Sequence, residues 1–126
     1  MLKTDKKGKD YYGSSMWTTM HVFAAAYDGS TKKAKAFIKY VRKIIPILFP
    51  CKTCADHWLQ VLEEIPPENY LSNNHDLFFF TYIAHDRVND NYNKHHPDKP
   101  KKISPDFNDC KIFYFKLLSA ECADCQ

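Results

Sequence analysis

The sequence contains little glycine, with three residues among 126. A β protein with many tight turns usually needs more, because glycine readily takes the positive φ angles of such turns. The longest apolar runs, residues 44–49 and 77–80, are far too short to cross a bilayer, so we expect no membrane span. No apolar h-region follows the charged residues 1–12, so we expect no secretory signal. These shortages favour one helical domain.

The charge and the aromatic content further limit the kinds of protein that fit this sequence. The net charge is +3, and much of the lysine lies near residues 3–9 and 94–102. Basic and aromatic residues do not alternate as they do in RNA-binding segments, so we expect solvated lysines and no nucleic-acid partner. Nine Phe, eight Tyr and two Trp suit a helical core that is packed with large rings.

Apolar residues recur at helical spacing along most of the chain. Trp17, Met20 and Ala24 share one face of the first helix, and the Asp-Gly-Ser sequence at 28–30 should end it. Pro46 should kink or end the second helix, because proline lacks an N–H and clashes with the preceding turn.

Five helices with short connections predict an all-α fold, a compact four-helix bundle with an additional short fifth helix. Ser104 is the expected N-cap of the fifth helix, and Pro105 its first residue. The predicted helices cover residues 14–27, 31–45, 51–65, 74–92 and 104–119, and the inward stripe of the third is Ala55, Trp58, Leu59 and Leu62.

Two CxxC pairs, Cys51/Cys54 and Cys122/Cys125, contain four of the five cysteines. A CxxC can form a reversible disulfide or supply half of a metal site. Cys51 opens a helix, where free N–H groups and the helix dipole can lower a thiol pKa from ~8.5 toward ~7. We therefore expect Cys51 to be the attacking or exchanging sulfur, and Cys54, one turn further on, to be more buried.

Three kinds of site are compatible with the first pair. A thioredoxin-like CxxC follows a strand, whereas this one follows a predicted helix. A zinc module usually spaces its CxxC pairs by about 15–20 residues, and Cys122 lies far beyond that distance from Cys54. His57 nevertheless adds a CxxCxxH pattern, so a zinc-binding interaction module without catalytic activity stays open as the alternative. The third kind is a dithiol oxidase that uses a bound cofactor.

The surroundings of the first pair resemble a known family. Residues 13–27 resemble the pattern G-x3-W-x3-H-x2-A-A-x-Y, and residues 49–57 resemble P-C-x-x-C-A-x-H. Residues 85–89 resemble H-N-x-V-N. In this order and spacing the three segments are similar to those of the Erv/ALR family of FAD-linked sulfhydryl oxidases, across roughly residues 13–94.

The resemblance implies FAD as the cofactor, held in the helix bundle, and it implies roles for individual residues. Cys51 would be the interchange cysteine and Cys54 the cysteine next to the flavin. Lys94 and Arg87 would meet the pyrophosphate. The residues that the resemblance assigns to FAD binding are Gly13, Trp17, His21, Tyr27, Cys54, His57, His85, Val88, Asn89, Tyr92 and Lys94.

The implied reaction is the oxidation of thiols in client proteins by a homodimer. Client thiols would reduce a shuttle disulfide between Cys122 and Cys125, and that dithiol would reduce Cys51–Cys54 by exchange. A structural disulfide or a reduced pair at Cys122 and Cys125 stays open as the alternative to the shuttle. The electrons would then reach O2 through FAD and give hydrogen peroxide. The implied regions are a charged N-terminal segment (1–12), an FAD-binding sulfhydryl oxidase domain (13–119) and a C-terminal tail with the second CxxC (120–126).

Some positions depart from the family pattern. Asp86 replaces the Asn of H-N-x-V-N, and residues 90–95 keep only Lys94 of the usual continuation. Tyr82 occupies one position of a disulfide found in many members, so we expect Cys110 to be an unpaired, partly buried thiol. Short members of this kind occur in large DNA viruses, which implies host cytoplasm or virion; other members imply the mitochondrial intermembrane space.

Overall fold

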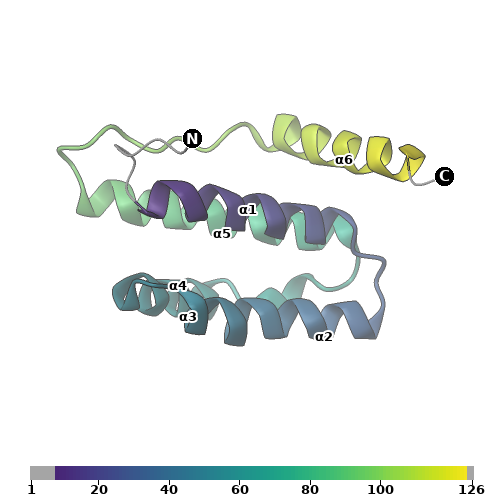
Figure 1. The fold of residues 1–126 in the computed structure, drawn as a ribbon, viewed down its shortest axis with the longest axis horizontal. Helices are drawn as coiled ribbons and strands as arrows, with labels where there is room; N and C mark the ends of the chain where they lie inside the picture. Colours follow the sequence, from purple (N-terminus) through teal and green to yellow (C-terminus); the bar gives the residue numbers. More distant parts are fainter. Residues whose placement is uncertain (1–7, 125–126) are drawn as a thin grey trace.

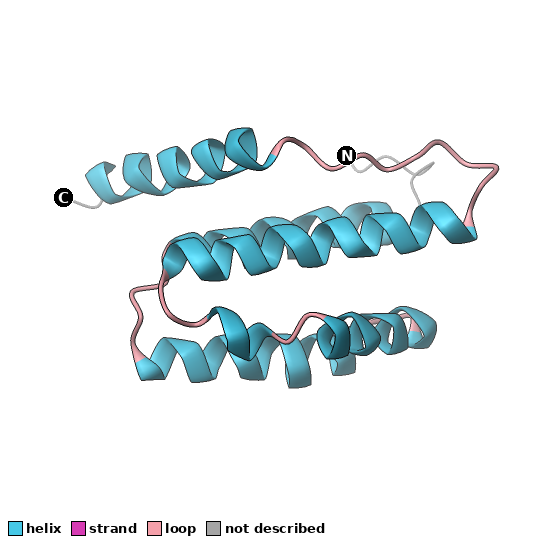
Figure 2. Ribbon diagram, turned by 180° about the vertical axis from the view of Figure 1, so that it is seen from behind, coloured by secondary structure: helices cyan, strands magenta, loops and turns pink. Residues whose placement is uncertain are grey.

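The structure, a computed structural model, describes the backbone of residues 8–124 and the side chains of residues 13–119. The backbone of residues 8–124 contains helices and loops but no strand, which confirms the predicted all-α class (Figure 2). Within the described residues no helix is long and apolar enough to span a bilayer. The elements are α1 (Gly8–Ala25), α2 (Thr31–Lys39), η1 (Tyr40–Ile44), α3 (Ile45–Leu48), α4 (Lys52–Glu64), η2 (Pro67–Tyr70), α5 (Asn74–His95) and α6 (Phe107–Asp124).

The helices form three tiers (Figure 1). Helices α1 and α5 lie side by side in the middle tier and run in opposite directions. On one side of them lie α2, α3 and α4, and on the other side lies α6 (Figure 1). The four-helix bundle therefore consists of α1, the α2–η1–α3 segment, α4 and α5. As predicted, α6 is the additional helix.

Large apolar side chains from four helical segments fill the core. Phe78 and Phe80 of α5 are fully buried, as are Leu62 of α4 and Val41 of η1. Burying such a side chain stabilises the fold by about 1.5–3 kcal/mol. Ala24 of α1 is also fully buried. The predicted stripe of α4 is correct at three positions, but Leu59 is 42% exposed and Val61 is buried in its place.

The α2 segment accommodates Pro46 differently from the prediction. The α-helical register ends at Lys39, and a π-helical turn, η1, follows. The N–H of Ile45 donates to Tyr40 O, five residues earlier, and the helix then continues through Pro46 to Leu48. Pro46 therefore does not end the helix, because the wider turn places it after the distortion and within the first turn of α3.

Several helix boundaries also differ from the predictions, most of all at the two ends of the chain. Helix α1 begins at Gly8, earlier than residue 14, and α6 continues to Asp124, beyond residue 119. The expected N-cap of the last helix was wrong, since Asp106 and not Ser104 accepts a main-chain N–H, that of Asp109, at 3.2 Å. Ser104 instead contacts α5, as described below. The predicted break after α1 is correct, and Gly29 there has a φ of 83°.

Candidate active site

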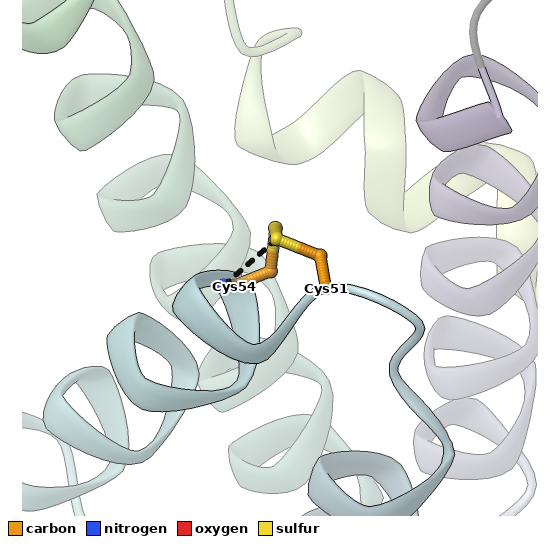
Figure 3. Close-up of a disulfide and its surroundings, with 2 residues drawn as sticks. All are labelled: Cys51 and Cys54. Atoms are coloured by element: carbon orange, nitrogen blue, oxygen red, sulfur yellow. Dashed lines mark hydrogen bonds between the residues drawn. A yellow bond between two sulfur atoms is a disulfide. The ribbon is translucent and has the colours of Figure 1, made fainter.

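Cys51 and Cys54 form a disulfide at the start of α4 (Figure 3). Their Cα atoms lie 5.2 Å apart, an ordinary separation for a disulfide. Cys51 is the N-cap of α4, and its Sγ accepts the main-chain N–H of Cys54 at 3.2 Å (Figure 3). Both cysteines are half-buried, so Cys54 does not stand out as the more buried of the two.

Trp58, one helical turn after Cys54, packs α4 against the middle tier of helices. It follows Cys54 by four residues on α4, so the two side chains occupy the same helical face. Its ring is buried and packs edge-on against Trp17 of α1, with centroids 5.6 Å apart. Trp17 in turn lies flat on His85 of α5, at 4.1 Å and 4°. A continuous series of aromatic contacts therefore runs from α4 through α1 to α5.

The rings of Trp17, Trp58 and His85, together with His21, form the central cluster of the candidate site. Two predicted cofactor residues, His21 and His85, meet in this cluster. His21 Nε2 lies 3.4 Å from His85 Nδ1, and His21 Nδ1 lies 2.8 Å from Thr81 Oγ1. Burial, with a smaller effect of His85, lowers the pKa of His21 to about 4. Burial and then the nearby charge of Lys102 lower the pKa of His85 to about 4. Both rings are therefore neutral at pH 7.

Ser104, which was predicted to cap the last helix, instead bonds to Asn89 and Asp86 of α5. The Ser104 hydroxyl donates to Asp86 Oδ1 at 2.6 Å and accepts from Asn89 Nδ2 at 3.1 Å. Ser104 thus ties the loop before α6 to the polar face of α5. The Asp that departs from the family pattern is paired with this hydroxyl.

The C-terminal end of α5 gathers the predicted residues His57, Tyr92 and Lys94 in one region. His57 of α4 faces His95, with ring centroids 5.8 Å apart. The Lys102 ammonium lies 4.3 Å from the centroid of the Tyr92 ring. Lys94 is exposed in the last turn of α5.

The remaining predicted cofactor residues have other surroundings. Tyr27 is buried, donates to Leu71 O at 2.8 Å, and lines a hollow of about 550 Å³ with residues of α2. A Cβ at Gly13 would meet no atom within 4 Å, so this position offers open space on α1. Val88 packs at the margin of the core. Arg87 forms an ion pair with Glu64.

Several residues near the cluster were not predicted as site residues. Thr81 lies four residues before His85, so its polar side chain in an apolar stripe was a signal that could have revealed it. Lys102 and Ser104 come from a loop, and periodicity gives no indication of where a loop folds back. Trp58 was expected only in the core.

The other cysteines lie away from this cluster or outside the described side chains. Cys110 is a free, half-buried thiol on α6, as predicted, and burial raises its pKa. The backbone at Cys122 is part of α6, whereas the tail was predicted to follow the helix. Cys125 lies outside the described residues.

The cluster suits FAD chemically. Flat rings at Trp17 and His85 match an aromatic ligand, and neutral imidazoles match its hydrogen-bonding edges. Lys94 and Lys102 supply positive charge for a pyrophosphate from the same end of α5 and the loop beyond it. Among the described residues, no group of three His, Cys, Asp or Glu side chains is placed to hold a metal ion, so the zinc alternative gains no support there.

Comparison with known proteins is consistent with this arrangement. The model of the Erv1 / Alr family matches residues 14–108. The chain belongs to the Erv1/Alr family. Protein 096R of Invertebrate iridescent virus 3 is 31% identical over 84 residues, which cover 66% of this chain and 57% of that protein. The FAD-linked sulfhydryl oxidase ERV1 of Arabidopsis thaliana is 33% identical over 61 residues, 48% of this chain.

The family assignment extends to the fold. The crystal structure of the yeast Erv1 core aligns with a TM-score of 0.64 at 24% identity, covering 86% of this chain and 84% of that one. The Erv1/Alr segment here spans 57% of the viral relative's length and 32% of the plant relative's.

Proposed function

We propose that this chain is an FAD-dependent thiol oxidase that forms disulfide bonds in protein substrates. The observation that carries the proposal is the Cys51–Cys54 disulfide at the N-terminus of α4, one helical turn before Trp58, whose ring packs against the Trp17–His85 stack. Membership of the Erv1/Alr family supports it, as does the name FAD-linked sulfhydryl oxidase of the plant relative.

Thiol exchange at α4 begins the reaction. The attacking dithiol is either a small substrate or the Cys122/Cys125 pair after exchange with a client protein has reduced it. Its first thiolate attacks Sγ of Cys51, which forms a mixed disulfide and releases Cys54 as a thiolate. Its second thiolate attacks the sulfur bound to Cys51 and releases Cys51 as a thiolate. The attacking dithiol has then lost two electrons, and the Cys51/Cys54 pair has gained them. The N-cap position favours Cys51 as the leaving thiolate, because the Cys54 N–H and the helix dipole stabilise negative charge there.

The remaining residues of the cluster would hold FAD. When bound, FAD supplies the two-electron chemistry that returns the pair to the disulfide and reduces O2 to hydrogen peroxide. Trp17 and His85 would orient its rings, and Lys94 and Lys102 would meet its phosphates.

The partners follow from the same proposal. The substrates are proteins that carry thiols, and the active form is a homodimer in which Cys122 and Cys125 pass electrons to Cys51. The exposed side chains of Ile112, Phe113 and Leu117 on α6 support burial of this helix against another molecule. Multi-angle light scattering of the purified chain tests the dimer.

The purified protein tests the function directly. It should be yellow, release FAD on denaturation, and consume O2 when dithiothreitol is added. Cys54→Ser should retain FAD but lose O2 consumption, whereas Cys110→Ser, the control, should retain both. A colourless protein that contains stoichiometric zinc would refute the proposal in favour of the zinc-binding module.

A further inference from the structure

Thr81 makes two short hydrogen-bond contacts in the interior of the bundle. Its hydroxyl lies 2.7 Å from the carbonyl oxygen of Phe78 and 2.8 Å from Nδ1 of His21. Thr81 is fully buried and His21 is 3% exposed, so water does not compete for these contacts. The hydroxyl carries one hydrogen and can donate only once.

This single hydrogen fixes the direction of both contacts. A carbonyl oxygen can only accept, so Thr81 must donate to Phe78 O. Thr81 can then only accept from His21, which requires a hydrogen on Nδ1 of His21. His21 is neutral at pH 7, because burial lowers its pKa to about 4, and therefore its Nε2 carries a lone pair and no hydrogen.

The same reasoning continues into His85. Its Nδ1 lies 3.4 Å from the bare Nε2 of His21 and must donate for the contact to be favourable. His85 is also neutral at pH 7, so its own Nε2 is left without a hydrogen. Among the described residues none forms a hydrogen bond with this Nε2, and no buried side-chain nitrogen or oxygen lacks a partner, so Nε2 is not fully buried. The lone pair of His85 is therefore open to a bound molecule.

We propose that Thr81 is a positioning residue of the cofactor site, which sets the tautomers of His21 and His85 so that His85 presents Nε2 as a hydrogen-bond acceptor. The Trp17 ring, stacked on His85 within 4° of parallel, holds the plane of the imidazole and hence the direction of the lone pair. This inference rests on the proposed function, since it assigns the ligand at Nε2 to FAD.

The tautomer restricts which part of FAD can bind there. A bare ring nitrogen attracts an N–H or O–H donor and repels the oxygens of a phosphate. FAD offers such donors at its adenine amine, its flavin imide and its sugar and ribityl hydroxyls. His85 therefore receives one of these groups, and the pyrophosphate lies elsewhere, toward the lysines.

Imidazole nitrogen NMR of the wild-type protein without FAD tests the tautomers without any substitution. Long-range ¹H–¹⁵N correlations distinguish the two neutral tautomers, and both His21 and His85 should carry hydrogen on Nδ1 at pH 7. Hydrogen on Nε2 of either ring would overturn the inference. This readout does not depend on FAD binding, so it remains decisive if the proposed function fails.

Substitutions test the link to the cofactor. Thr81→Val keeps the shape of the side chain but removes the hydroxyl, and should weaken FAD binding on the order of tenfold, the size of one hydrogen bond. Its histidine correlations should also change. Thr81→Ser keeps the hydroxyl and should bind FAD nearly as the wild type does, even if Thr81→Val fails to fold.

A matched control separates this effect from a general loss of helix stability. Thr19 also donates its hydroxyl to a main-chain carbonyl of its own helix, that of Ser15 at 2.9 Å. Thr19→Val should leave FAD affinity and the histidine correlations unchanged. If the wild type binds FAD and Thr81→Val binds it equally well, the positioning role is wrong and the proposed function stands. If the wild type binds no FAD, the proposed function is wrong.

Discussion

The indole Nε1 of Trp58 donates to the main-chain carbonyl of Val41 at 2.8 Å. This carbonyl has no donor within its own helix. In the π register its partner would be the N–H of residue 46, which is proline, and the N–H of Ile45 is bound to Tyr40 O instead. Trp58 thus satisfies a buried acceptor that Pro46 leaves without a partner, and it fixes α4 against η1.

Removing this bond should destabilise the fold in a way that depends on Pro46. Trp58→Phe keeps a large ring but leaves Val41 O buried without a donor, which should lower the unfolding free energy by about 1–3 kcal/mol. In a Pro46→Ala background the new N–H can reach Val41 O, so the same substitution should cost about 1 kcal/mol less. Urea unfolding of the four proteins measures the difference, and equal costs in both backgrounds would contradict this account.

The buried histidines should make stability depend on pH in a defined window. The pKa values of His21 and His85 are lowered to about 4 in the folded chain, so between pH 4 and 6.5 the unfolded chain binds more protons. Stability is therefore greatest above pH 6.5 and falls as the pH decreases toward 4. The slope should approach about 1.4 kcal/mol per pH unit for each proton taken up on unfolding.

Urea unfolding at several pH values between 4.5 and 7 checks this slope, and His85→Gln, which removes one of the two groups, should flatten it. The carboxyls of Asp28 and Glu68 do not confuse the result. Hydrogen bonds from Ser30 lower the pKa of Asp28 to about 2 from 3.8, and the Arg42 guanidinium lowers that of Glu68 from 4.5, so the stability that these carboxylates contribute is lost mainly below pH 4.5. An unchanged slope in His85→Gln would show that the histidines are not responsible.

The helix content and the CxxC motif were predictable because both depend on short segments. The spacing of Trp17, Met20 and Ala24 defines a helical face locally, and Cys51 and Cys54 lie one turn apart in any helix. The π turn was not predictable, because it depends on whether a distant side chain, Trp58, satisfies the displaced carbonyl.

The same limit applies to the candidate site. Lys102 lies at Tyr92 because both the main-chain N–H and the carbonyl of Lys102 bond to the Asn93 amide, at 2.8 and 2.9 Å. Ser104 satisfies Asp86 instead of capping α6, since Asp106 performs that role. Each of these pairs joins a loop to α5, and sequence spacing carries no information on such pairing.

The two active-site sulfurs should differ in reactivity. With all other cysteines replaced by serine, the chain that retains Cys51 alone should react faster with a disulfide reagent at pH 7 than the chain that retains Cys54 alone. The N-cap position and the Cys54 N–H favour the Cys51 thiolate. The release of thionitrobenzoate as a function of pH measures the reactivity of both sulfurs, and indistinguishable profiles would argue against Cys51 as the interchange cysteine.

Lys102 should contribute to FAD binding through its charge. Lys102→Gln should weaken FAD binding several-fold, by on the order of 1 kcal/mol, and the loss should shrink at high salt because added ions screen exposed charges. Lys101 is its exposed neighbour, so Lys101→Gln is the matched control and should bind FAD as the wild type does. Fluorescence titration at two salt concentrations compares them, and equal losses in both variants would assign the effect to general charge.

The second CxxC should matter for protein substrates more than for small ones. Dithiothreitol can diffuse to the half-buried Cys51 directly, whereas a folded client is larger and should need an intermediate carrier. Cys122→Ser should therefore slow the oxidation of a reduced client protein several-fold and leave dithiothreitol oxidation nearly unchanged. Cys110→Ser removes a thiol from the same helix and should change neither rate. O2 consumption with the two substrates measures the ratio, and a Cys122→Ser enzyme that loses both activities equally would remove the shuttle from the proposed reaction.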